Sequence, residues 1–185
     1  AGMEKPTKGG VRITGVSISR LDERQLAEFR QKHLGFVFQS YNLLPNLNAI
    51  ENVAMPLMFR GVPKRKRETI ARAMLKRVGL GKRMNHYPTQ MSGGQQQRTS
   101  IGRAIIKNPS ILLCDEPTGA LDYNTGKAVL KLLQDTCRNT GTTVIVITHN
   151  QALTAMADRV ITVKSGTVEK VVMNDNIRNV EDLEW

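Results

Sequence analysis

The spacing of apolar residues changes twice along this chain. Short apolar runs near the start predict strands at residues 11–16 and 34–38, with a polar helix over 22–32 between them. From residue 41 to 107 the spacing becomes helical, and one predicted helix face is formed by Ile70, Met74, Leu75 and Val78. Gly79 and Gly81 then end that helix. The stretch is predicted to be a helical lobe.

After Pro109 the pattern alternates between strands and helices. It predicts strands at 111–114 and 143–147, helices at 125–138 and 151–156, and a hairpin of 160–163 with 168–172 around Ser165 and Gly166. Such alternation is typical of a mainly parallel sheet covered on both faces. We therefore expect an α/β fold with an inserted helical lobe.

Composition narrows the functional classes. The 185 residues suit one domain with a real core, and their net charge of +11 would permit binding to nucleic acid or an anionic membrane. However, the basic residues are scattered, aromatic residues are few, and the one tight run, Lys64–Arg67, is typical of a solvated helix start. We therefore expect no nucleic acid as the main ligand. Cys114 and Cys137 lack metal spacing and are expected to be free thiols. No apolar run approaches the roughly 20 residues of a spanning helix, so any membrane should belong to a partner.

The segment Ser92–Gln95 has the chemistry of an anion-binding helix start. Ser92 and Gln95 fit the Ser-x-x-Gln capping box, and Gly93 with Gly94 would let a ligand approach the backbone closely. The free N–H groups and the positive end of the helix dipole favour a phosphate. Taken alone, a capped helix with two glycines is ordinary.

Polar residues follow three of the predicted strands. Asp115 and Glu116 end the buried strand at 111–114, where a carboxylate can hold a metal ion through water and its neighbour can activate a water. His149 follows the strand at 143–147, and Gln39 follows the strand at 34–38. Because open α/β sheets bind ligands at the carboxyl ends of their strands, these side chains are expected on one rim.

Taken together, these motifs resemble the ATP-binding-cassette (ABC) ATPases. Met91–Arg98 resembles the family's signature motif, with Met91 in place of the commoner leucine, and Ile111–Asp122 resembles Walker B running into the D-loop. Details at 35–39, 41–45, 51–53 and 118–122 look most like the branch paired with macrolide-exporter, lipoprotein-releasing, peptide-antibiotic-resistance and cell-division permeases. The resemblance implies a P-loop NTPase-like core in two parts, 1–40 and 108–185, with the helical lobe at 41–107.

The resemblance also implies ligands, partners and roles for single residues. The ligands would be ATP and Mg2+, and the partners would be membrane permease subunits and a second copy of the chain in a head-to-tail homodimer. The protein would lie in the cytoplasm, on the inner face of the cell membrane, with its permease docked around Tyr41–Phe59. The implied roles are metal binding for Asp115 and Gln39, water activation for Glu116, γ-phosphate contact for His149, contact with the partner's nucleotide for Ser92, Gly93, Gly94 and Gln95, and a place at the dimer seam for Asp122.

One expected motif is absent from the sequence, because it contains no G-x-x-x-x-G-K-[ST] phosphate loop. By the resemblance, the chain begins inside the domain and lacks the N-terminal part of the core, so these 185 residues are expected to bind ATP weakly and not to hydrolyse it. One alternative is a non-enzymatic fragment that binds the permease. Another is a soluble ABC-type ATPase of DNA repair or translation, although the chain contains neither the coiled-coil insertion nor the second cassette of such proteins.

Overall fold

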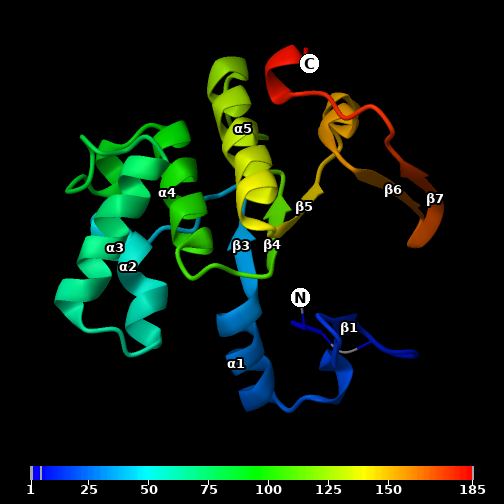
Figure 1. Ribbon diagram of the computed structural model, residues 1–185, viewed down its shortest axis with the longest axis horizontal. Helices are drawn as coiled ribbons and strands as arrows, with labels where there is room; N and C mark the ends of the chain where they lie inside the picture. Colours follow the sequence, from blue (N-terminus) through cyan, green and yellow to red (C-terminus); the bar gives the residue numbers. More distant parts are fainter. Residues whose placement is uncertain (1, 5, 185) are drawn as a thin grey trace.

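The computed structural model describes residues 2–4 and 6–184, and a parallel sheet of three strands lies at its centre (Figure 1). The strands β3 (Leu34–Val37), β4 (Ile111–Asp115) and β5 (Thr143–Ile147) are neighbours in that order. In the register of β4 and β5, Asp115 lies opposite Ile147. Residues that follow these strands therefore meet at one edge of the sheet, as the α/β prediction requires.

Three helices pack together on one side of the sheet (Figure 1). They are α2 (Ala49–Phe59), α3 (Lys64–Arg77) and α4 (Gly93–Ile105), and the 3-10 turn Pro88–Gln90 leads into α4. Their buried side chains share one core with residues of β3, β4 and α5 (Tyr123–Thr140). The division of the chain at residues 40 and 107 stays a prediction, because this core runs across both boundaries.

Side-chain caps fix where the helices begin. Asp22, Asn48 and Ser92 each form a capping box, at the starts of α1 (Glu23–His33), α2 and α4. The capping box predicted for Ser92 and Gln95 is thereby confirmed. Each cap satisfies N–H groups that the first helical turn leaves without a partner, which defines the helix start to within one residue.

The N-terminal segment differs from the prediction. Instead of one strand over 11–16, it forms a small antiparallel hairpin of β1 (Arg12–Ile13) and β2 (Val16–Ser17). Thr14 and Gly15 between them have positive φ angles of 49° and 81°, which turn the chain back at this point. A 3-10 turn, Ile18–Arg20, then leads to α1, whose Leu26 and Phe29 pack with Leu34 of β3.

The C-terminal part forms a hairpin and then returns to α5. The 3-10 helix Gln151–Met156 precedes the antiparallel strands β6 (Arg159–Lys164) and β7 (Thr167–Met173), as predicted to within two residues. The segment that follows ends in the 3-10 turn Val180–Asp182, whose buried Val180 packs with Leu130 of α5 (Figure 1). The sequence alone offered no prediction for this last segment.

At β5 the described residues of this chain cover only one face of the sheet. On one face, Val144 and Val146 pack into the core beneath α4 and α5. On the other face α1 packs on β3, so Ile145 and Ile147 of β5 remain 42% and 58% exposed. Separately, among the described residues no helix is long and apolar enough to cross a membrane.

The two cysteines are free, as predicted. Cys114 lies fully buried in β4, and burial raises the pKa of its thiol to about 12. A thiol held neutral in this way is a packing group and not a nucleophile.

Candidate functional site

The carboxylate of Glu116 is held by the residues that follow the neighbouring strand. Its Oε2 accepts a hydrogen bond of 3.0 Å from the Thr148 hydroxyl. Its Oε1 accepts bonds from the backbone N–H of His149 at 2.9 Å and from Nδ1 of the same histidine at 2.7 Å. The backbone N–H of Glu116 in turn donates to the carbonyl of Ile147 at 2.9 Å. The parallel pairing of β4 with β5 thus continues past both strands and joins Glu116 to His149.

The backbone at Glu116 is unusual, with a positive φ of 42°. A non-glycine residue in the left-handed region costs free energy and is found where surrounding structure holds it. Here the bond from Glu116 N to Ile147 and one of 3.1 Å from Gly119 N to Glu116 O hold the turn. The turn swings the Glu116 side chain towards Thr148, while the side chain of Asp115, still in β4, is exposed.

Electrostatics favour a charged Glu116. Partial burial raises its pKa, but the hydrogen bonds from the His149 ring, the His149 N–H and Thr148 outweigh that effect, so its pKa falls below the ordinary 4.5. Because an ionised carboxylate only accepts hydrogen bonds, Nδ1 of His149 carries the proton in this contact. The His149 side chain is 88% exposed, which leaves Nε2 open to a ligand.

Gln39 reaches the same rim. A Cβ placed on Gly119 would lie only 2.8 Å from Nε2 of Gln39 and 3.5 Å from Cβ of Glu116. The amide of Gln39 and the side chain of Glu116 therefore lie against the same glycine, which has room for both only because it lacks a side chain. The expected meeting of Gln39, Glu116 and His149 on one rim is what the geometry shows.

The predicted anion-binding residues form a second group at the start of α4. Ser92 Oγ accepts a bond of 3.4 Å from the N–H of Gln95, and Gln95 Oε1 accepts one of 3.2 Å from the N–H of Ser92. Gln96 N–H bonds to the carbonyl of Ser92 at 2.9 Å. The first helical N–H groups, those of Gly93 and Gly94, are used by none of these bonds, which leaves them for a ligand.

Packing within the chain also requires the two glycines, which the sequence did not reveal. A Cβ on Gly93 would lie 2.7 Å from the hydroxyl of Tyr41, and one on Gly94 would lie 2.0 Å from the Thr125 methyl. Gly94 is buried. The glycines therefore let α4 approach the start of α5 and the loop after Gln39, whatever they do for a ligand.

Asp122 belongs to this second group. It is the N-cap of α5, where its carboxylate accepts a bond of 3.1 Å from the N–H of Thr125. Hydrogen bonds from the side chain and backbone of Thr125 lower the pKa of Asp122. Asp122 is exposed, so the cap leaves its side chain accessible beside the Gly94 contact.

Two residues important to this arrangement were missed from the sequence. Gln97 is fully buried in α4, and its Nε2 donates to the carbonyl of Pro117 at 2.7 Å, next to Glu116. Its place on the buried face, four residues before Ile101, was the signal available. Arg103 donates to the carbonyls of Tyr41 and Asn42 at 3.0 Å and 2.6 Å, and burial lowers its pKa. No short motif marks Arg103.

The chain is similar to proteins of known family over most of its length. The family described as ABC transporter matches residues 1–119. An uncharacterized ABC transporter ATP-binding protein of Thermotoga maritima is 44% identical over 91% of this chain and 72% of its own length. The macrolide export ATP-binding/permease protein MacB of Salmonella choleraesuis is 44% identical over 90% of this chain, but over only 26% of its own length.

A solved structure agrees with these relatives. The dimeric post-hydrolysis state of the ATP-binding cassette MJ0796, bound to ADP and Pi, is 40% identical to this chain. It superposes with a TM-score of 0.84, covering 93% of this chain and 76% of the other. Sequence and fold thus agree, and the chain belongs to the ABC transporter family of ATPases.

Proposed function

We propose that this chain belongs to the ATP-hydrolysing subunit of a membrane transporter, which couples that reaction to transport by permease subunits. The observation that carries the proposal is the cluster of Glu116, Thr148 and His149 at the ends of two paired strands, with Gln39 beside it. The name of the MacB relative, an export ATP-binding/permease protein, supports the coupling to a permease. Contact with the permease would place the protein on the cytoplasmic face of the membrane.

Within this cluster, Glu116 is proposed to accept the proton of the attacking water. Its carboxylate is ionised and fixed by three hydrogen bonds, which suits a general base that must be oriented before the reaction. His149 keeps Nε2 exposed and is proposed to contact the terminal phosphate of ATP. Thr148, which the sequence did not suggest, is proposed as a positioning residue, because its hydroxyl donates to Glu116 and accepts from the backbone N–H of Asn150 in its own turn.

A magnesium ion is proposed at this rim. Asp115 offers an exposed carboxylate and Gln39 an amide oxygen, both ligands that Mg2+ accepts. Among the described residues no three His, Cys, Asp or Glu side chains gather into a metal cluster, so the remaining ligands would be phosphate oxygens and water. When bound, the ion would offset the negative charge of the phosphates.

The second group is proposed to serve the nucleotide held by another copy of the chain. Ser92, Gly93, Gly94 and Gln95 would present the open end of α4 to its phosphates, and Asp122 would lie at the seam between the two copies. The dimeric state of the MJ0796 cassette supports this arrangement. A permease would dock near Leu44, a 40% exposed residue whose N–H and carbonyl are both held by the side chain of Asn52.

The decisive experiment is Glu116→Gln in the full gene product. The change removes the base and keeps its size, and the amide oxygen can still accept both bonds from His149, so phosphate release should fall by roughly a hundredfold or more while nucleotide binding survives. Glu181→Gln is the matched control, because that carboxylate pairs with Lys131 on the far side of α5. Turnover of the Glu116 variant near the parent rate would remove Glu116 from the proposed role.

For these 185 residues by themselves, we propose weak or no binding of ATP. Most phosphate contacts of P-loop enzymes come from the G-x-x-x-x-G-K-[ST] loop, which this sequence does not contain. Calorimetric titration with Mg-ATP measures the affinity of this chain directly. Tight binding by this chain would show that other residues supply a phosphate site.

A further inference from the structure

The turn that joins α2 to α3 (Figure 1) carries an unusual combination of side chains. We call it the α2–α3 corner and define it as Met58 and Phe59 at the end of α2 together with Lys64–Arg67 at the start of α3. Phe59 is 65% exposed and Met58 is 46% exposed. Two large apolar side chains thus stand in solvent beside a run of four cations.

The backbone of this corner is well defined. Gly61, with a φ of 70°, donates to the carbonyl of Met58 at 2.9 Å, and Val62 donates to the carbonyl of Leu57 at 3.0 Å. These bonds satisfy carbonyls at the end of α2 in the manner of a glycine C-cap. Leu57 is buried, whereas the next two side chains point outwards. The exposure of Phe59 is therefore set by a fixed turn.

The cations lie where they weaken the helix. The first turn of α3 contains no acidic residue and four basic ones, although the N-terminal end of a helix dipole is positive. Lys64 pairs with Glu68 at 3.9 Å, but both groups are exposed and such a pair contributes little. In the described part of the chain no carboxylate pairs with Arg65 or Lys66. Arg67 also has a local role, because its guanidinium donates to the carbonyl of Val62 at 3.2 Å. Local pairing therefore leaves Arg65 and Lys66 unexplained.

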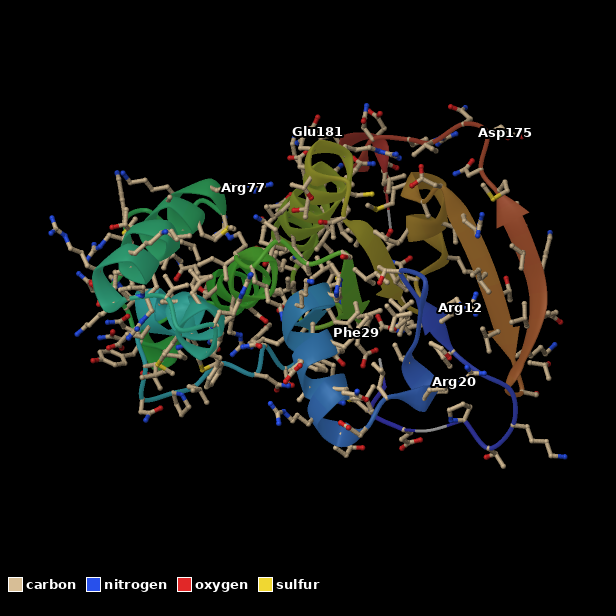
Figure 2. All side chains as sticks on the ribbon, turned by 60° about the horizontal axis from the view of Figure 1, so that its bottom comes forward. Arg12, Arg20, Phe29, Arg77, Asp175 and Glu181 are labelled. Carbon is tan, nitrogen blue, oxygen red and sulfur yellow. The ribbon has the colours of Figure 1, made fainter. Side chains whose placement is uncertain are left out.

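An anionic lipid surface would account for both the exposed apolar side chains and the cations beside them. Long lysine and arginine side chains reach phosphates while their stems follow apolar surface, and an exposed aromatic ring enters the boundary between headgroups and acyl chains. Figure 2 shows nitrogen-tipped side chains along the outer side of α2 and α3, at the opposite end of the molecule from the β6–β7 hairpin. Exposed cations beside exposed apolar side chains suit the headgroup layer of a membrane.

We propose that the α2–α3 corner binds the anionic headgroups of a phospholipid membrane directly, with Phe59 and Met58 entering the headgroup layer. The contact uses no residue of the ATP site, so its test is independent of the proposed ATPase function. Met58 and Phe59 also lie in the segment 41–59 where the permease is expected to dock, so the proposal requires that the permease leaves these two side chains uncovered.

Vesicle flotation tests the proposal. The chain should float with vesicles of phosphatidylcholine mixed with phosphatidylglycerol, should not float with phosphatidylcholine alone, and should be released by high salt. Arg65→Glu with Lys66→Glu should weaken binding by roughly thirtyfold or more, since each basic residue near an anionic surface strengthens binding about fivefold and the variant removes two. Phe59→Ser should also weaken it, without changing the unfolding transition, because Phe59 is exposed.

The matched control is Lys32→Glu with Lys170→Glu. Both lysines are exposed, on α1 and β7, and the pair changes the net charge by the same amount as the corner variant. Equal loss of binding in both double variants would overturn the proposal, because binding would then follow net charge alone. Binding to a DNA oligonucleotide in preference to the vesicles would overturn it in favour of a nucleic-acid surface.

A second measurement reports insertion directly. The variant Phe59→Trp should show a blue shift of its emission with the anionic vesicles, and quenching by lipids brominated near the headgroups, relative to the parent chain with its single tryptophan. A spectrum that does not change upon flotation would exclude insertion of the ring and overturn this part of the proposal.

Discussion

The contact between Gly94 and Thr125 allows a sharp prediction about how the start of α4 is held. A Cβ on Gly94 would lie 2.0 Å from the Thr125 methyl, far closer than two carbon atoms can approach. The Thr125 hydroxyl hydrogen-bonds Asp122, so rotation of the side chain away from the clash would lose that bond. Gly94→Ala should therefore destabilise the fold by about 1–3 kcal/mol, the usual cost of overpacking.

The structure also predicts which second change restores stability. Thr125→Ser removes the clashing methyl and keeps the hydroxyl, and the remaining distances from an alanine Cβ at residue 94 are then 3.4 Å to Cβ and 3.7 Å to Oγ of residue 125. Both are ordinary contacts. The double variant should therefore recover most of the loss, which gives a coupling energy of about 1–2 kcal/mol in a double-mutant cycle.

Urea denaturation followed by circular dichroism measures these free energies of unfolding. Gly102→Ala is the control in the same helix, because its added Cβ meets nothing closer than 3.5 Å. That change should be neutral or stabilise by about 0.5–1 kcal/mol, as alanine favours a helix interior over glycine. A Gly94→Ala variant as stable as Gly102→Ala would refute the reasoning, and so would a loss that Thr125→Ser leaves unchanged.

Three further predictions concern the pKa of Glu116, the charge of Lys107 and the buried amide of Asn52. His149→Ala should raise the pKa of Glu116, which an NMR titration measures. In the parent chain the lowered pKa of Glu116 stabilises the fold at pH values above 4.5, and this stabilisation is lost as the pH falls through the pKa of Glu116 in the folded state. Burial chiefly, and then the charge of the nearby Arg60, lower the pKa of Lys107 from 10.5 to about 8. The charged lysine therefore opposes folding at pH values below about 8. Lys107→Met should raise the urea midpoint of unfolding at about pH 7, and this gain should be smaller at about pH 10. Asn52→Leu should cost about 2–4 kcal/mol by denaturation, because the buried amide holds both backbone groups of Leu44.

The chemistry-bearing residues could be predicted because each follows a strand or starts a helix. The ends of parallel strands share an edge, so the order of Gln39, Glu116 and His149 along the chain already implied a common rim. The capping box at Ser92 is likewise local, since it depends on residues three apart. Both predictions needed only spacing and the pairing rules of α/β sheets.

Contacts between distant segments could not be predicted in the same way. The approach of Thr125 to Gly94 depends on how α4 and α5 pack, and the sequence gives no distance between helices. The last segment looked unpatterned because, among its described residues, only Val180 and Leu183 are buried. Bonds from side chains of α5 to its backbone also hold it, such as the one that the Tyr123 hydroxyl donates to the Leu183 carbonyl at 2.9 Å.

The missed residue Arg103 links the two groups of site residues within one chain. Its guanidinium fixes the carbonyls of Tyr41 and Asn42, whose positive φ angles of 61° and 48° make this a strained turn. The ring of Tyr41 then lies against Gly93, so the loop after Gln39 is fastened to both ends of α4. Because Gln39 lies two residues before this turn and beside Glu116, a shift at the start of α4 must move the turn or break these bonds. The rim and the helix start are therefore one mechanical unit, which is what a site completed by a second copy of the chain would require.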